Sequence, residues 1–216
     1  MFTAIRIACV ALAGYLIGNF NSALVISKLK KSDVRKMGSG NPGTMNMFRS
    51  FGKLLGVLTL VMDILKGVIP CLIGWFVCGE AWSFGANKIG VYVGGLSVIV
   101  GHIFPVFLKF KGGKGIASSI GVCLVIHPIA TLISFAVGVV FLIVTKIGSV
   151  TSFIIISVPL AMEAFSVSKT GGNIAALVLL FALFFLTLFA HRKNVVHLFQ
   201  GTDKQVILFK KKKKSA

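Results

Sequence analysis

The chain has 216 residues, of which 56% are hydrophobic and only 13% are charged, and this composition excludes an ordinary soluble domain. Its 23 basic and five acidic residues give a formal net charge of +18. The basic residues lie in short breaks between apolar runs, which is typical of membrane proteins and argues against nucleic acid as a partner. We therefore expect an all-α, polytopic membrane protein that meets acidic phospholipids in the bilayer and binds anionic substrates.

Apolar runs of about 20 residues, the length that a helix needs to cross a bilayer, divide the chain into membrane-spanning segments. We expect one membrane domain, 1–216, with about seven spans near 2–26, 54–77, 89–108, 116–126, 129–145, 147–165 and 173–190. The stretch after residue 116 is divided because Pro128 disfavours helix in His127 before it. Since 116–126 is short for a straight crossing, a re-entrant segment is the alternative there.

The basic loops predict the orientation of these spans. Lysine and arginine are frequent in 27–53, in 109–115 and in the tail 191–216, whereas the turn at 79–88 has a single lysine. By the positive-inside rule, the three basic stretches are cytoplasmic and the turn is outside. The N-terminus is then outside and the C-terminus cytoplasmic, which requires an odd number of crossings.

The first basic stretch contains a run of small and polar residues that is suited to anions. It reads Gly38-Ser39-Gly40-Asn41-Pro42-Gly43-Thr44-Met45-Asn46 and is followed by Arg49. Backbone N–H groups in such a loop can bind an anion, and an arginine can hold phosphate through two hydrogen bonds. A flexible turn before a capped short helix explains the same residues equally well.

A lysine- and glycine-rich turn joins the third and fourth spans and reads Lys109-Phe110-Lys111-Gly112-Gly113-Lys114-Gly115. The lysines could simply keep the loop cytoplasmic, but this does not explain the glycines around Lys114. Glycines let backbone N–H groups approach an anion closely. His102 precedes the turn and could transfer a proton or brace the loop, and the bracing role is favoured.

Asp63, Lys66 and Glu163 are charged residues that lie inside the apolar segments. Asp63 and Lys66, spaced i, i+3 near the cytoplasmic end of the second span, are expected to pair and to support the structure. Glu163 lies at the outer end of a span, and we expect it to face water. Beyond the last span, Asp203 is unusual because acidic residues are so scarce in this chain.

Several chemistries are absent from the sequence. It has no Gly-x-Ser-x-Gly elbow, no complete P-loop, no paired carboxylates at glycosidase spacing, and no His–carboxylate or Cys-x-x-Cys cluster for a metal. We therefore expect no metal and no cofactor. A protein with these loops would act by binding anions and orienting reactants, which suits transfer from an already activated donor.

The three loops, in this order, resemble the bacterial membrane acyl-phosphate:glycerol-3-phosphate acyltransferases, the PlsY family. The matching segments cover nearly the whole chain and are Tyr15–Gly18, Gly38–Asn41 with Gly43, Asn46 and Arg49, Asp63–Gly67, Gly101-His102 with Pro105–Gly115, and His191-Arg192 with Asn194 and Gly201. The resemblance implies seven helices and an active site on the cytoplasmic face of the bacterial plasma membrane. It also implies acyl transfer from acyl phosphate to glycerol 3-phosphate, giving lysophosphatidate and phosphate, the first step of phospholipid synthesis.

The resemblance implies roles for individual residues. Ser39 and Arg49 belong to the catalytic first loop, and His191 and Asn194 contribute from the third. Substrate-binding residues are expected in both glycine-containing loops and just before the second: Gly38, Gly40, Asn41, Thr44, Asn46, His102, Lys109, Lys111, Gly112, Gly113, Lys114 and Gly115. Structural support is expected from three charged residues: Asp63, Lys66 and Asp203.

The proton acceptor, the effect of departures from the family pattern and an alternative function stay open at this point. The proton of the acceptor hydroxyl is taken either by His191 or by a substrate phosphate oxygen. Five positions depart from the family pattern: Asn19, Asn21, Met45, His197 and Asp203. The alternative function is a transporter or flippase for an organic phosphate or lipid intermediate, which the basic loops and Pro- and Gly-interrupted spans also fit. The absence of a visible inverted repeat argues against it.

Overall fold

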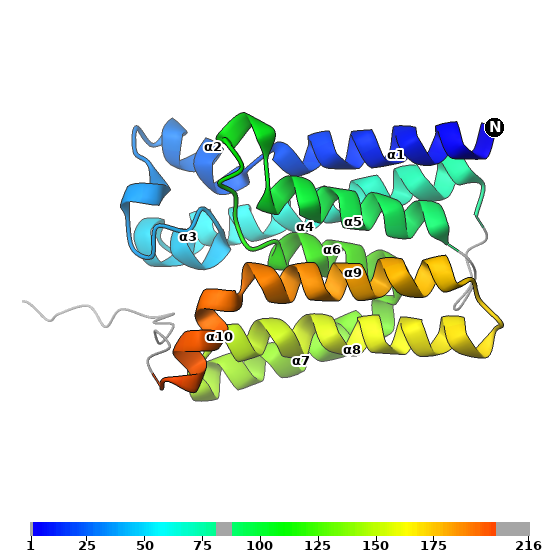
Figure 1. The fold of residues 1–216 in the computed structure, drawn as a ribbon. Helices are drawn as coiled ribbons and strands as arrows, with labels where there is room; N and C mark the ends of the chain where they lie inside the picture. The colour runs from blue at the N-terminus through cyan, green and yellow to red at the C-terminus, as the bar shows by residue number, and fades with distance from the viewer. Residues whose placement is uncertain (1, 81–87, 202–216) are drawn as a thin grey trace, which may run out of the picture.

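Apolar helices form the body of the structure, a computed structural model that describes residues 2–80 and 88–201 (Figure 1). The longer helices are α1 (Phe2–Asn19), α4 (Lys53–Cys78), α5 (Ile89–Ile103), α7 (Pro128–Thr145), α8 (Gly148–Lys169) and α9 (Ile174–Ala190). The shorter elements are α2 (Ser22–Leu29), η1 (Val34–Lys36), α3 (Thr44–Phe51), η2 (Val106–Leu108), α6 (Ile116–Ile126) and α10 (Arg192–Phe199). These ranges contain no strand, so the expected all-α fold is confirmed.

Five segments within the described ranges are long and apolar enough to cross a membrane, and the α9–α10 pair, bent by 61°, would be a sixth. α6 is shorter, and it ends at His127, where Pro128 begins α7 as expected. The molecule is therefore a helical integral membrane protein. The total of seven crossings and the orientation of the termini stay predictions.

The first span differs from expectation because its helix does not run unbroken to Ile26. α1 ends at Asn19, and α2 begins at Ser22 with Asn21 as its N-cap. The Asn21 Oδ1 atom accepts the Leu24 backbone N–H at 2.9 Å, which satisfies one of the unpaired N–H groups at the start of α2. A capping side chain inside an apolar run thus divides the helix.

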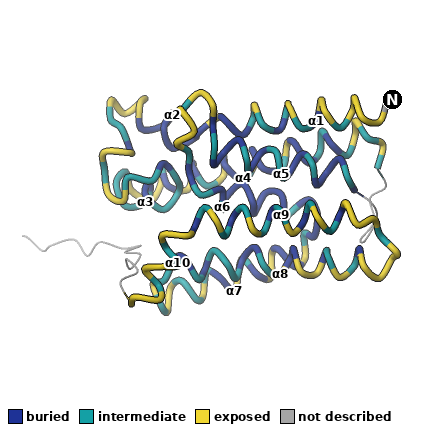
Figure 2. Tube along the Cα trace, viewed as in Figure 1, coloured by how far each residue is buried: buried dark blue, intermediate teal, exposed yellow. Residues whose placement is uncertain are grey.

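The helices form two groups that α6 and α9 join. α1, α4 and α5 pack together, and α7 packs with α8 (Figure 1). α6 packs against α4 on one side and against α7 and α8 on the other, and α9 packs against both α5 and α8. Small residues bring α1 against α5, because a Cβ atom on Gly18 or Gly101 would overlap the backbone of the facing helix. Buried positions run along the inner faces of these helices, and exposed ones lie along their outer faces and at the ends of the bundle (Figure 2).

Glu163 does not face water, so that expectation is wrong. Glu163 is fully buried, and its Oε1 atom accepts hydrogen bonds from Lys88 Nζ (3.0 Å) and from the Tyr92 hydroxyl (2.7 Å). Lys88 Nζ also donates to the Ile126 carbonyl oxygen at 3.3 Å. A buried carboxylate requires such charged and hydrogen-bonding partners. The packing supplies them to Oε1, whereas Oε2 is buried and has no hydrogen-bond partner among the described residues. The contacts tie α8 to the start of α5 and the end of α6.

Candidate active site

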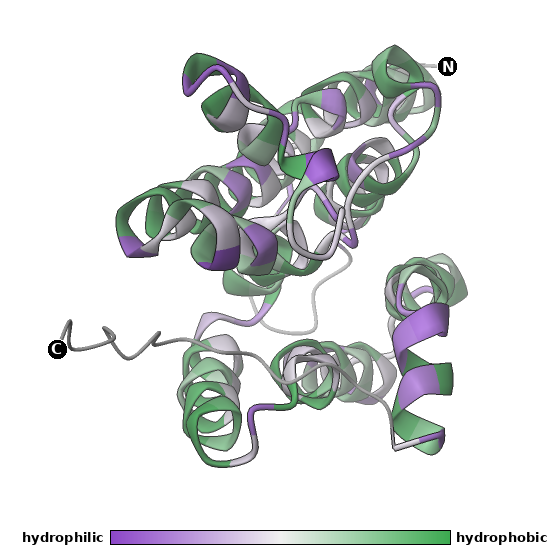
Figure 3. Cartoon of the chain, turned by 90° about the vertical axis from the view of Figure 1, so that its left-hand side faces the viewer, coloured by the Kyte–Doolittle hydropathy of each residue, from purple (hydrophilic) through white to green (hydrophobic). Residues whose placement is uncertain are grey.

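The polar loops lie together at one end of the bundle. α2, α3, the α5–α6 connection and α10 lie at the left of Figure 1, and the N-terminus lies at the other end. Viewed onto this end, α10 and the connecting loops carry the hydrophilic positions, whereas the long helices are mostly hydrophobic (Figure 3). We refer to residues 30–52, 104–115 and 191–201 as the first, second and third loops.

Asn46 braces the first loop from inside. It is 1% exposed, and its Nδ2 atom donates to the carbonyl oxygens of Val34 (3.0 Å) and Met37 (2.9 Å). Its Oδ1 atom accepts the backbone N–H of Ser39 at 3.0 Å and faces the Ser50 hydroxyl at 3.5 Å. Both amide hydrogens are therefore used within the loop. This geometry gives Asn46 a bracing role rather than the expected direct contact with substrate.

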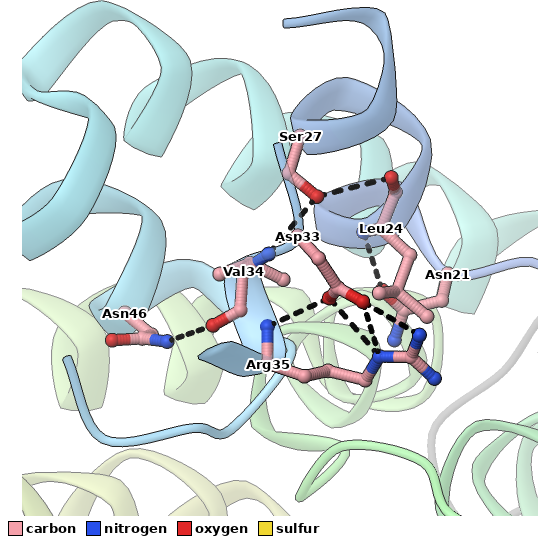
Figure 4. A network of polar contacts seen from close by, with 7 residues as sticks. All are labelled: Asn21, Leu24, Ser27, Asp33, Val34, Arg35 and Asn46. Atoms are coloured by element: carbon pink, nitrogen blue, oxygen red, sulfur yellow. Dashed lines mark hydrogen bonds and ion pairs between the residues drawn. The ribbon is translucent and has the colours of Figure 1, made fainter. Parts of the chain in front are cut away.

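The base of the first loop is held by short-range polar contacts (Figure 4). The Ser27 hydroxyl donates to the Leu24 carbonyl oxygen and accepts the Val34 N–H. Asp33 caps η1 by accepting the Arg35 backbone N–H, and it also pairs with the Arg35 guanidinium at 2.7 Å. These hydrogen bonds from Arg35 lower the pKa of the Asp33 carboxyl to about 2. The contacts fix where the loop leaves α2.

Several expected residues of the first loop remain available to an anion. Gly38 and Gly40 adopt positive φ angles of 58° and 73°, and Ser39 between them is exposed. Arg49, half-buried on α3, has no hydrogen bond or ion pair with any residue in the described ranges. The Thr44 hydroxyl oxygen is buried and likewise has no hydrogen-bond partner there. A guanidinium and a hydroxyl without protein partners are suited to a phosphate.

The second loop is pinned to the end of α5 by its backbone. The Gly113 N–H donates to the His102 carbonyl oxygen at 3.1 Å, and the Gly112 N–H donates to that of Ile103 at 3.2 Å. A Cβ atom on Gly113 would overlap His102 Nε2, so only glycine fits against the imidazole. Lys109 and Lys111 are exposed on this turn. The turn thus presents two lysines over a fixed backbone.

A buried polar network lies beneath the second loop. The expected Asp63–Lys66 pair is present, with Lys66 Nζ 3.4 Å from Asp63 Oδ1. Lys66 Nζ also lies 2.7 Å from His102 Nδ1 and donates to the Phe20 carbonyl oxygen at 2.7 Å. The Ser22 hydroxyl donates to Asp63 Oδ1 at 2.7 Å. His102 therefore has the contacts of a brace, the role that the sequence favoured.

The third loop begins with a buried histidine. His191 is 2% exposed, and its Nδ1 atom lies 3.0 Å from the Thr187 carbonyl oxygen. A carbonyl oxygen can only accept, so Nδ1 carries the hydrogen and Nε2 is the basic nitrogen. The Phe153 ring packs edge-on against the imidazole, with 5.4 Å between the ring centroids, and fixes its orientation. Asp203 lies outside the described residues.

A side-chain contact joins the second and third loops. Lys114 Nζ donates to Asn194 Oδ1 at 2.5 Å, across 80 residues of sequence. The amide oxygen therefore directs the ammonium group. The lysine–glycine turn and the start of α10 thus form one surface, as expected from loops on the same side of the membrane.

Sequence reasoning missed two parts of this arrangement. It did not identify Ser22 as a partner of Asp63, and it did not place Lys66 against His102. A signal for the first was present, because Asn19, Asn21 and Ser22 are polar residues inside an apolar run. The contact with His102 depends on how α4 packs against α5, which spacing along the chain does not show.

Comparison with known proteins gives one consistent family. The sequence matches the family described as glycerol-3-phosphate acyltransferase over residues 8–201. It is 36% identical over 200 residues to a glycerol-3-phosphate acyltransferase of Thermoanaerobacter pseudethanolicus, covering 91% of this chain and 93% of the relative. A glycerol-3-phosphate acyltransferase of Clostridioides difficile is 34% identical, with 95% of this chain and 97% of the relative covered.

Solved structures agree with this similarity. The crystal structure of PlsY, an integral membrane glycerol 3-phosphate acyltransferase, in its glycerol 3-phosphate form superposes with a TM-score of 0.77. That protein is 32% identical, and the match covers 92% of this chain and 94% of PlsY. Its lysophosphatidic acid form gives a TM-score of 0.76 at the same identity and coverage.

Proposed function

Because the chain belongs to the glycerol-3-phosphate acyltransferase family, it is an acyltransferase, and we propose that it transfers an acyl group from acyl phosphate to the 1-hydroxyl of glycerol 3-phosphate. The products would be lysophosphatidate and inorganic phosphate, in the first step of phospholipid synthesis. The enzyme would lie in a bacterial plasma membrane with its three loops at the cytoplasmic face. The fatty chain of the donor can then stay in the bilayer while the polar ends of both substrates meet at its edge.

The contact between Lys114 and Asn194 carries this proposal. It joins the lysine–glycine turn to the third loop at the end of the bundle that also holds α3, where Arg49 has no hydrogen bond or ion pair with another described residue. Both proposed substrates carry phosphate, so a site for them needs cations and backbone donors in more than one loop. This end of the bundle offers both.

We assign the phosphate contacts to two loops. In the first loop, the groups without a hydrogen bond to another described residue are the Gly38 N–H and the side chains of Ser39, Asn41, Thr44 and Arg49. Gly40 shapes this loop through its positive φ, because its N–H is used on the Met37 carbonyl oxygen. In the second loop, the available groups are the ammonium groups of Lys109 and Lys111 and the Gly115 N–H, with Lys114 beside them. Gly112 and Gly113 shape this turn, because their N–H groups are used on Ile103 and His102. Asn46 and His102 would support these contacts from behind.

The transfer itself balances without a cofactor. The acceptor hydroxyl oxygen attacks the acyl carbonyl carbon, the new ester bond forms, and the bond between that carbon and the phosphate oxygen breaks. Phosphate leaves with the electron pair. The hydroxyl proton passes to His191 Nε2 or to a substrate phosphate oxygen. The hydrogen bond to the Thr187 carbonyl oxygen places the ring hydrogen of His191 on Nδ1, so Nε2 is the nitrogen of this ring that would take the proton.

A direct assay tests the proposal. Purified protein in detergent is incubated with palmitoyl phosphate and labelled glycerol 3-phosphate, and lysophosphatidate and phosphate are measured together. We expect both products in equal amounts. Accumulation of labelled substrate in sealed vesicles without product would instead support transport.

Arg49 offers a matched variant pair for the same assay. Arg49→Ala removes the unpartnered guanidinium and is expected to lower kcat/KM by about 100-fold, because charged hydrogen bonds to phosphate are among the strongest in proteins. Arg35→Ala removes an arginine of the same loop that is already paired with Asp33, and its turnover is expected to stay near that of the unaltered enzyme. Equal losses in the two variants would contradict a specific role for Arg49.

A further inference from the structure

The buried lysine of α4 has partners on its own helix and on the two segments that lead to the first and second loops. A lysine ammonium has three N–H donors and no acceptor. Lys66 Nζ has three partners, namely Asp63 Oδ1 at 3.4 Å, the Phe20 carbonyl oxygen at 2.7 Å and His102 Nδ1 at 2.7 Å. Lys66 is 4% exposed and Asp63 is 2% exposed. This network therefore fixes one geometry rather than sampling several.

One branch of this network leads to the first loop. Phe20 lies in the break between α1 and α2, and Asp63 accepts a hydrogen bond from Ser22 at the start of α2. The residue between them, Asn21, caps α2 and donates from Nδ2 to the Pro42 carbonyl oxygen at 3.1 Å. Pro42 lies within the glycine-rich run of the first loop. The break is thus attached to α4 on one side and to this loop on the other.

The other branch leads to the second loop. Because Lys66 donates to Nδ1 of His102, the ring hydrogen of His102 is on Nε2, and that edge of the ring lies against Gly113. The carbonyl oxygen of the same histidine accepts the Gly113 N–H. The imidazole therefore holds the lysine–glycine turn through both its ring and its backbone.

We propose that Lys66 is a positioning residue for acyl transfer, which sets the first loop and the lysine–glycine turn at a fixed separation through Asp63 and His102. This inference rests on the proposed two-substrate reaction. When two substrates bind to different loops, the reacting atoms meet only if the loops are in register. A misplacement of about 1 Å costs on the order of 100-fold in rate.

This role predicts a specific kinetic pattern. Each loop keeps its own cations and backbone donors when Lys66 is removed, so the affinity for each substrate should change little. The rate of the step that needs both loops should fall. We expect Lys66→Met combined with Asp63→Asn, which leaves no unpaired buried charge, to lower kcat by about 100-fold while both KM values change less than about threefold.

His102 provides the test by rescue. Asparagine places an amide oxygen near the position of Nδ1 and can accept from Lys66, whereas leucine cannot. His102→Asn is therefore expected to keep most of kcat, and His102→Leu to lose it to the same extent as the Lys66 variant. Equal turnover in the two His102 variants would overturn the proposal.

The matched control is the buried lysine pair at the other end of the bundle. Lys88→Met with Glu163→Gln also removes a buried ion pair, but that pair contacts Tyr92 and Ile126 rather than a loop of the site. We expect it to keep kcat near that of the unaltered enzyme. A loss of kcat as large as in the Lys66→Met, Asp63→Asn protein would mean that any buried pair matters equally, and would overturn the proposal.

A distance measurement gives a readout that is independent of turnover. Spin labels are attached to cysteines at Lys36 and Phe107, which are exposed on the first and second loops, after the accessible Cys9 and Cys78 are changed to serine. Double electron–electron resonance should give a narrow distance distribution in the unaltered network. It should broaden in the Lys66→Met, Asp63→Asn protein, and an unchanged distribution would overturn the proposal.

The unaltered enzyme separates this inference from the proposed function. If it makes no lysophosphatidate from acyl phosphate, the proposed function fails, and the label distances alone still report whether Lys66 holds the loops. If it is active and the Lys66→Met, Asp63→Asn protein matches it in kcat, the positioning role fails and the function stands.

Discussion

Within residues 2–80 and 88–201, two buried lysine–carboxylate pairs are present, and they are built in different ways. Asp63 and Lys66 lie on one helix, and the lysine reaches outward to the break before α2 and to His102. Lys88 and Glu163 are 75 residues apart and join the start of α5 to α8. The first pair is surrounded by segments that lead to loops, whereas the partners of the second lie inside the helical bundle.

The comparison shows that burial alone does not define a role. The two lysines are 4% and 5% exposed, and both have a carboxylate partner. What differs is the segment at the far side of each network. A pair that holds loops is expected to act on kcat, and a pair that holds helices is expected to act on the free energy of unfolding.

The largest effect on stability is expected from breaking the second pair on one side only. Lys88→Met leaves the Glu163 carboxylate buried without its cation, which should lower the free energy of unfolding by about 3–5 kcal/mol. Thermal unfolding in detergent measures this loss. Adding Glu163→Gln removes the unpaired charge and should restore most of the stability. A single variant as stable as the unaltered protein would contradict the role of this pair.

A smaller effect is expected where the first network meets the second loop. Gly113→Ala introduces a Cβ atom that overlaps His102 Nε2, and the imidazole cannot move away because Lys66 holds its other nitrogen. Such overpacking costs about 1–3 kcal/mol of folding free energy unless the turn shifts. Because a shift of the turn misplaces the substrate that it holds, kcat should fall on the order of tenfold. Steady-state kinetics with both substrates measures the change.

The His102→Asn variant sharpens the prediction for Gly113→Ala. The shorter side chain of His102→Asn leaves room for the new methyl group, so combining it with Gly113→Ala should recover most of the lost kcat. Failure of this recovery would show that the alanine acts through the backbone of the turn and not through the imidazole.

The two networks also show what the sequence could predict. Asp63 and Lys66 were paired from their i, i+3 spacing, since the geometry of a helix alone sets that contact. The burial of Glu163 could not be predicted in the same way. Lys88 and Tyr92 reach it only because helices far apart in sequence pack together. The all-α fold followed from long apolar runs, whose lengths are local information.

In the loops too, the sequence predicts the local composition but not the contacts that folding creates. The glycine and lysine residues of the second loop indicated an anion site from composition, but its attachment to His102 depends on how the turn folds back over α5. Asn46 was grouped with the substrate-binding residues, yet its amide is used on Val34 and Met37. A polar side chain that braces a loop and one that binds substrate have the same appearance in a sequence, and only the positions of the neighbouring carbonyl groups separate them.

The smallest effect is expected from the exposed pair of the first loop, Asp33 and Arg35. Its hydrogen bonds lower the pKa of Asp33 to about 2, below the usual value of about 3.9, so its stabilisation is complete above about pH 4 and is lost as the pH falls toward 2. Solvent screening keeps the contribution small. The difference in unfolding midpoint between the unaltered protein and Asp33→Asn should therefore be constant from pH 7 to 5 and shrink below about pH 4. If that difference in unfolding midpoint instead changed near neutral pH, a group other than Asp33 would be titrating. The loss of stability in acid would then not distinguish this exposed pair from the two buried pairs.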